Sequence, residues 1–169
     1  TVSKRWSIPV IIFDLTKGMA MVWVAQLLGL DIALQIVVGL AAIIGHNWSV
    51  FLCFSGGRGM FTSLGIILIL SPILGLTTLV IAYLFAPFRQ LSLGVVIALV
   101  VLPIQSWFLS QPMGIDERLP ITVGYTAILL MTTFRRLAIP RTSISTDVST
   151  RELIVNRLLF DRDIRDRKA

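Results

Sequence analysis

The segment GHNWSVFLCFSGGRGMFTSLG, from Gly45 to Gly65, lies between long apolar runs and is the most informative part of the chain. It is polar and rich in glycine, and it holds the chain's one histidine. The runs on both sides are apolar enough to lie in lipid. At membrane depth, irregular backbone is tolerated only where protein buries it or where it borders a wet cavity. The segment is therefore predicted to be a functional site between membrane-spanning helices.

The composition is that of a multi-span membrane protein. Of the 169 residues, 56% are hydrophobic and 14% are charged, and the mean hydropathy is +0.88. The apolar runs predict spans at 8–30, 32–52 with a break near residue 45, 62–70, 73–88, 91–109 and 120–134. The predicted fold class is an all-α, polytopic transmembrane bundle of about five to six helical segments. The start at Thr1, not Met, predicts one further segment before it.

The net charge of +6 is uneven, because residues 135–169 carry nine Lys or Arg and five Asp or Glu. A basic segment beside the last span is typical of a cytoplasmic end. Residues 1–134 are therefore predicted to be a transmembrane domain, and 135–169 a cytoplasmic tail. With the tail inside, the glycine-rich loop and Arg89 also fall on the cytoplasmic face of the plasma membrane. The five Asp or Glu residues of the tail argue against nucleic acid as a partner.

The tail contains its own helix signal. Ser149 and Glu152 fit a capping box, in which a serine N-cap is followed three residues later by a glutamate. Apolar residues at helical spacing follow, interleaved with arginines. This pattern predicts an amphipathic helix lying on the inner membrane surface. The apolar residues are Leu153, Ile154, Leu158 and Leu159.

The loop from Ser55 to Gly59 has the chemistry of an anion site. Successive glycines allow backbone N–H groups to converge on an anion, and the N-terminus of a following helix adds positive potential. Arg58 can bind phosphate oxygens with two parallel hydrogen bonds, and Thr62 or Ser63 can add a hydroxyl. The alternative is a flexible loop or a tight turn between helices. The arginine at membrane depth favours the anion site.

His46 suits proton transfer or donation to a phosphate, because its pKa is near neutral. The alternative is a helix-end histidine bonded to a carbonyl. Asp14 and Lys17 share one face of the first span, and embedded charges are costly unless they are paired or functional. They are predicted to form an ion pair that faces the bundle and borders the site. The sequence shows no metal-ligand cluster, and no cofactor is predicted.

The glycine-rich segment resembles a motif of the integral-membrane acyl-phosphate:glycerol-3-phosphate acyltransferases, the PlsY family. That motif is close to G-H-x-x-P-x-F-x-x-F-K-G-G-K-G-V-A-T-S-L-G. The segment from Gly45 to Gly65 follows it, with Ser49 in place of its proline and with Ser55 and Arg58 in place of its two lysines. The family's D-x-x-K-G is matched by the segment that starts at Asp14. A third family motif, roughly H-R-x-N-I-x-R-L-x-x-G-x-E, has a partial counterpart in residues 150–163, with Asp163 for the glutamate.

The resemblance implies transfer of a fatty acyl group from acyl phosphate to glycerol 3-phosphate, giving lysophosphatidic acid in phospholipid synthesis. The implied partners are these two substrates and the lipid bilayer. Direct transfer is favoured over an acyl-enzyme, because no serine or cysteine nucleophile has an adjacent base. His46 is predicted to be catalytic. The predicted substrate-binding residues are Asp14, Lys17, Asn47, Ser55, Gly56, Gly57, Arg58, Gly59, Thr62, Ser63 and Arg157.

Two other functions use the same residues. An anion or phosphometabolite transporter would bind phosphate in the loop without chemistry, although a second copy of the loop would then be expected. A non-catalytic membrane homologue would bind lipid or partners, and the partial third motif favours it. Such a homologue would keep its function after His46→Ala or Arg58→Ala.

Overall fold

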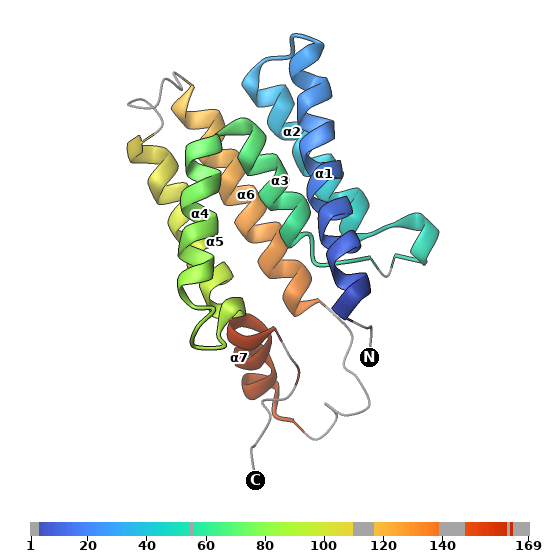
Figure 1. Cartoon of the computed structure of the whole chain (residues 1–169), viewed down its shortest axis with the longest axis vertical. Helices are drawn as coiled ribbons and strands as arrows, with labels where there is room; N and C mark the ends of the chain where they lie inside the picture. Colours follow the sequence, from blue (N-terminus) through green and yellow to red (C-terminus); the bar gives the residue numbers. More distant parts are fainter. Residues whose placement is uncertain (1–3, 55, 110–116, 139–147, 162, 164–169) are drawn as a thin grey trace.

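The computed structural model describes residues 4–54, 56–109, 117–138, 148–161 and 163, and the helices of these segments form one bundle (Figure 1). The predicted all-α class is confirmed. In chain order the helices are α1 (Lys4–Leu27), α2 (Ile32–Asn47), the 3₁₀ turn η1 (Val50–Leu52), α3 (Met60–Leu70), α4 (Pro72–Leu84), α5 (Leu91–Leu109), α6 (Arg118–Leu137) and α7 (Thr150–Phe160).

Successive bundle helices run in opposite directions, so the polar connections divide between two ends (Figure 1). The start of α1, the loop between α2 and α3, the turn between α4 and α5 and the end of α6 lie toward the lower end of the bundle in Figure 1, and α7 lies below the bundle. We call this the site end. Short loops between antiparallel neighbours are the ordinary topology of a helical bundle. The fold therefore gathers residues that are far apart in the sequence.

Two glycines allow α1 and α3 to pack backbone against backbone. A Cβ on Gly18 would collide with the carbonyl oxygen of Thr62, and one on Gly65 with that of Leu15. Small residues at such crossings are the usual way for membrane helices to approach closely. The two contacts fix α3, and with it the end of the glycine-rich loop, against the first span.

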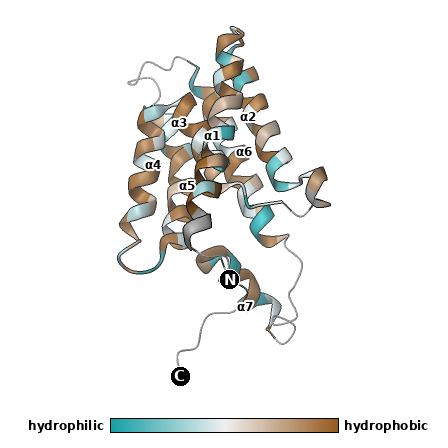
Figure 2. Cartoon of the chain, turned by 45° about the vertical axis from the view of Figure 1, so that its right-hand side comes forward, coloured by the Kyte–Doolittle hydropathy of each residue, from teal (hydrophilic) through white to brown (hydrophobic). Residues whose placement is uncertain are grey.

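The bundle is apolar inside and outside. Its core includes Val22, Ile43, Ile66, Leu74, Leu102, Ile121 and Ile128. Large apolar side chains are also exposed around the outside, among them Phe13, Val37, Val80, Phe108 and Leu130. Hydrophobic colouring covers the sides of the helices in Figure 2. Ile8–Leu27 and Leu91–Leu109 are long and apolar enough to cross a membrane, and α2, α3 and α4 are shorter apolar helices. An apolar exterior of this extent is what lipid contact requires.

The structure also refines the predicted span boundaries. The second span ends at Asn47, and the chain then forms the short turn η1, where the side chain of Phe51 is 98% exposed. The last span continues to Leu137, three residues beyond the predicted domain boundary at 134. As a result, Arg135 and Arg136 belong to α6 and are buried.

The predicted tail helix is present as α7. Its N-cap is Ser149, whose hydroxyl accepts a hydrogen bond from the Glu152 backbone N–H at 3.3 Å. The helix packs against α5 and α6, with Leu153 and the polar Asn156 buried. Ile154 and Val155 are exposed. The tail helix is therefore docked on the site end, a contact that its sequence pattern did not predict.

Candidate functional site

Asp14, Lys17 and His46 form a polar cluster between α1 and α2, the α1–α2 cluster. The Lys17 Nζ lies 2.6 Å from the Asp14 Oδ1 and 2.5 Å from the His46 Nδ1. The predicted ion pair is therefore confirmed. Because a lysine ammonium has only donors, this geometry makes Nδ1 the acceptor and assigns the ring proton to Nε2. The ring proton is thus placed on Nε2, at the edge of the ring that faces Gly57.

The glycine-rich loop covers the other edge of the His46 ring. A Cβ on Gly57 would collide with the His46 Nε2, and one on Gly56 would collide with the His46 carbonyl oxygen. Gly59 has φ +71°, in the left-handed region that favours glycine, and precedes α3 as its N-cap. The glycines therefore let the loop lie against the end of α2. The predicted nest of N–H groups for a phosphate stays a prediction.

Arg135, near the end of α6, holds this loop in place. Its Nε and Nη2 donate to the carbonyl oxygens of Gly57 and Gly56 at 3.2 and 3.0 Å. Its guanidinium also lies 5.5 Å from the centre of the Trp48 ring. A planar guanidinium suits this combination of two donors and a stacked face. Arg135 thus links the last bundle helix to the loop that touches His46.

A second cluster, the arginine cluster, joins Arg58, Arg136 and Asp161. The Asp161 carboxylate pairs with the Arg58 Nη1 through Oδ2, and its Oδ1 lies 3.7 Å from the Arg136 Nε. Arg58 also donates to the Asp161 carbonyl oxygen at 3.0 Å. The Arg136 side chain is only 2% exposed, whereas that of Arg58 is 36% exposed. Two guanidinium groups from different elements therefore meet on one carboxylate.

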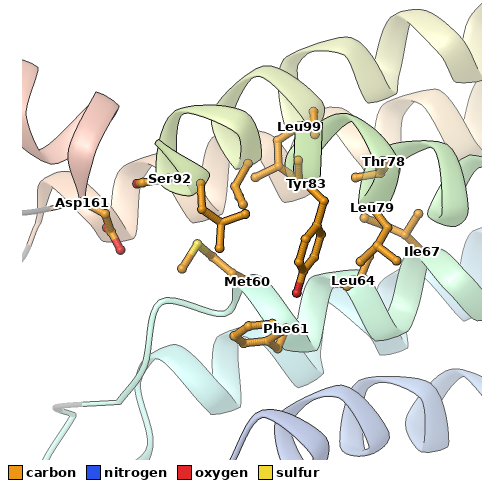
Figure 3. A pocket seen from close by; sticks show the side chains of 14 residues that line it. Met60, Phe61, Leu64, Ile67, Thr78, Leu79, Tyr83, Ser92, Leu99 and Asp161 are labelled. Atoms are coloured by element: carbon orange, nitrogen blue, oxygen red, sulfur yellow. The ribbon is translucent and has the colours of Figure 1, made fainter. Parts of the chain in front are cut away.

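An apolar groove of about 280 Å³ leads away from the arginine cluster (Figure 3). One wall is α3, with Met60, Phe61 and Leu64, and the other is formed by α4 and α5, with Tyr83 and Leu99. Figure 3 shows Asp161 and Ser92 at one end of the groove, and mainly apolar side chains, together with Thr78 and Tyr83, along the rest. A groove with charge at one end and an apolar body matches an amphiphile with an anionic head and an apolar chain.

The predicted substrate-binding residues outside the α1–α2 cluster divide into three groups. Gly56, Gly57 and Arg58 are half-buried at the site end, Gly59 is buried, and Ser55 lies outside the described residues. Asn47, Thr62 and Ser63 are fully buried behind the loop. Their side-chain polar atoms have no hydrogen-bond partner within the described segments.

Arg157 has a third kind of environment. Its Nε donates to the Asp163 Oδ1 at 2.8 Å and its Nη1 to the Leu137 carbonyl oxygen at 3.0 Å. It therefore ties the tail to the end of α6, and its contact with a substrate stays a prediction.

Sequence reasoning missed Arg135, Arg136 and Asp161. The two arginines carried a signal, because they are a basic pair at the end of the last span, but the pair was read only as evidence for membrane orientation. Asp161 is 103 residues away from Arg58 along the chain. It looked like one charge among several in a mixed tail.

Comparison with known proteins gives a consistent result. The family described as "Glycerol-3-phosphate acyltransferase" matches residues 1–141. Two proteins from strains of Dehalococcoides mccartyi, named glycerol-3-phosphate acyltransferase 4 and 5, are 41% and 43% identical to this chain over 169 residues. These alignments cover 100% of this chain, 73% of the first relative and 72% of the second.

Crystal structures of PlsY, described as an integral membrane glycerol 3-phosphate acyltransferase, share the fold. The glycerol 3-phosphate form has a TM-score of 0.71 at 25% identity and covers 97% of this chain and 72% of its own. The lysophosphatidic acid form has a TM-score of 0.69 at 24% identity, covering 96% and 73%.

Proposed function

The chain belongs to the glycerol-3-phosphate acyltransferase family, and we propose that the site end of its bundle transfers a fatty acyl group from acyl phosphate to glycerol 3-phosphate. In this reaction a hydroxyl oxygen of glycerol 3-phosphate attacks the acyl carbon. The bond from that carbon to the phosphate oxygen breaks, and the hydroxyl proton leaves with the phosphate. The products are lysophosphatidic acid, for phospholipid synthesis, and inorganic phosphate.

The observation that carries the proposal is the apolar groove that ends at the arginine cluster. Arg58 and Arg136 supply two positive charges at the mouth of the groove. A phosphate has three strong acceptor oxygens and a charge of about −1.5 to −2 at neutral pH, so it matches this pair. The acyl chain would then lie between α3 and the α4–α5 pair, against Phe61, Leu64 and Leu99. We assign this groove to the acyl donor and the acyl chain of the product.

The second substrate is assigned to the α1–α2 cluster and the glycine-rich loop. Lys17 and the loop glycines supply donors for the phosphate of glycerol 3-phosphate. Because Lys17 donates to the His46 Nδ1, the ring proton is on Nε2, and this proton would polarise a reacting oxygen. Holding two bound reactants in place lowers the barrier without an acyl-enzyme.

We further propose that the site end faces the cytoplasm across the plasma membrane. Arg58, Arg89, Arg135 and Arg136 all lie at this end, whereas the opposite end, which also holds Asp31, has one arginine among the described residues, Arg118, beside Glu117. This charge distribution is the one that the positive-inside rule associates with a cytoplasmic face. Labelling of single cysteines introduced at Asp31 and at Arg89 in intact cells would test the orientation. Labelling at Arg89 by an impermeant reagent would contradict it.

The reaction is tested by phosphate release from acyl phosphate by the chain in detergent, with and without glycerol 3-phosphate. We expect release that requires glycerol 3-phosphate and falls roughly tenfold to hundredfold in Arg58→Ala, the size of one lost charge-assisted hydrogen bond. Arg118→Ala, which removes an arginine at the opposite end of α6, is the matched control and keeps its rate. No release from folded wild-type protein would rule out the enzymatic function.

A further inference from the structure

Asp161 occupies an unusual position at the mouth of the groove. It is the C-cap of α7, its φ is +58°, and its N–H donates to the Asn156 carbonyl oxygen. Its side chain is 18% exposed and borders both the arginine cluster and the groove. A non-glycine residue in this left-handed conformation is uncommon, although aspartate tolerates it better than most. The docked tail therefore places a carboxylate where the groove ends.

The donors that bind this carboxylate are those that an arriving head group would need. Arg58 gives the carboxylate its closest contact, and the Arg136 Nε lies on its other oxygen. The remaining described contacts of Arg136 are with the Leu158 carbonyl oxygen, the Met60 Sδ and the Ser92 hydroxyl, at 3.1, 2.9 and 3.5 Å. None of these partners is anionic. An anion at the mouth must therefore share the two guanidinium groups with Asp161 or replace it.

We propose that Asp161 is an internal competitor for the substrate head group: it occupies the position of the acyl donor's phosphate, and phosphate binding displaces it. The inference rests on the assignment of the groove to the acyl donor. Because Asp161 belongs to the same chain, it competes at a high effective concentration. The ligand binds only the fraction of the protein in which Asp161 has left the arginines, so its apparent affinity is the intrinsic affinity multiplied by that fraction. Displacement also removes one of the two contacts between Arg58 and the C-terminal end of α7, the other being the hydrogen bond to the Asp161 carbonyl oxygen. Binding of the donor and docking of the tail are thereby coupled.

Asp161 should oppose only those ligands whose head group must contact Arg58 and Arg136. Lysophosphatidate serves here as a stable stand-in for the acyl donor: its acyl chain fits the groove, and its phosphate can reach the arginines when no acyl phosphate is bound. Its phosphate-free counterpart, monoacylglycerol, has the same acyl chain and differs in the head group. Removing the Asp161 charge is expected to tighten the binding of lysophosphatidate roughly tenfold, because a charge-assisted contact no longer opposes it. The affinity for monoacylglycerol should not change, since a neutral head does not need to displace a carboxylate.

The test measures binding of radiolabelled palmitoyl lysophosphatidate and palmitoyl monoacylglycerol to the whole chain in nanodiscs. The variants are Asp161→Asn and Asp161→Gly; glycine accepts a φ of +58° without strain, which protects against a folding failure. Glu152→Gln is the matched control, because it removes one negative charge from the exposed start of α7. We expect tighter lysophosphatidate binding in both Asp161 variants and unchanged binding in the control.

Hydrogen exchange gives the second readout. Lysophosphatidate should speed the exchange of α7 amides in the wild type and have little effect on them in Asp161→Gly. If Asp161 only ties the tail to the bundle, both variants will bind lysophosphatidate equally or more weakly, and that result overturns the inference. Neither measurement needs turnover. Binding that responds to Asp161 without acyl transfer would refute the proposed function alone, and acyl transfer with unresponsive binding would refute this inference alone.

Discussion

The two polar clusters at the site end are built in different ways. The α1–α2 cluster joins residues three and 29 positions apart on two packed bundle helices. The arginine cluster joins Arg58 to a residue 103 positions away, at the end of a tail helix. The first cluster depends on core packing, and the second depends on the docking of α7. Because local stability follows such differences in packing, the arginine cluster is expected to open more easily.

The two clusters are therefore suited to different tasks in the proposed reaction. A cluster that orients a reacting group benefits from fixed geometry, and the position of His46 is fixed by Lys17 on one side and Gly57 on the other. A cluster that admits a large amphiphile needs to open, and the Asp161 contact joins the bundle to the tail and is not part of the bundle core. The three predictions below separate the two clusters, in order of decreasing effect.

The largest effect is expected from Gly57→Ala. The new Cβ would fall on the His46 Nε2, so either the ring or the loop must move. A misplacement of about 1 Å near the reacting groups is expected to lower kcat/KM about a hundredfold. Lysophosphatidate binding at the arginine cluster should persist. Phosphate-release kinetics and the nanodisc binding assay measure the two effects.

Gly45→Ala is the control for this substitution. A Cβ at Gly45 meets nothing within 4 Å, and alanine favours the helix there. Its activity should match the wild type. Equal losses in Gly45→Ala and Gly57→Ala would mean that the contact with His46 is not the cause.

A smaller effect is expected from Arg135→Lys. The lysine keeps the charge but cannot donate to the Gly56 and Gly57 carbonyl oxygens while stacking on Trp48. We expect kcat/KM to fall about tenfold, the value of roughly one hydrogen bond from a charged group. Initial rates measured over a range of glycerol 3-phosphate concentrations test this.

Arg118→Lys is the matched substitution at the opposite end of α6, where the arginine lies 4.1 Å from the Trp107 ring. It should leave the rates unchanged. If Arg135→Lys is equally harmless, the loop does not depend on Arg135 for its position.

The parts of the molecule that sequence could predict are those governed by local patterns. Apolar runs predicted the helical class, and the spacing of Asp14 and Lys17 predicted their ion pair, which is confirmed. The serine N-cap of α7 followed from a four-residue pattern. In each case the relevant residues are neighbours in the chain, so periodicity and capping rules apply directly.

The arginine cluster escaped prediction because it depends on docking between distant segments. Nothing in the sequence around Asp161 marks it as the partner of Arg58, because a mixed-charge tail resembles a solvated one. Arg136 is likewise buried at the end of α6, where it donates to the Leu158 carbonyl oxygen of α7. Contacts of this kind depend on how α7 packs against the bundle, which short-range patterns do not encode.

The smallest effect, and the sharpest test of the difference between the clusters, is expected from loss of a helix cap in each region. Ser149→Ala removes the acceptor for the Glu152 N–H at the start of α7, and Asp31→Ala removes the acceptor for the Leu34 N–H at the start of α2. Each loss costs about 1 kcal/mol locally.

If the arginine cluster depends on α7 docking, Ser149→Ala will speed the exchange of α7 amides about fivefold. It will also tighten lysophosphatidate binding, by less than Asp161→Asn does, because a looser tail is a weaker competitor. Asp31→Ala loosens only the far end of α2 and should leave this binding unchanged. Equal responses to the two cap losses would mean that the clusters open together, and the site end would then be a single cooperative unit.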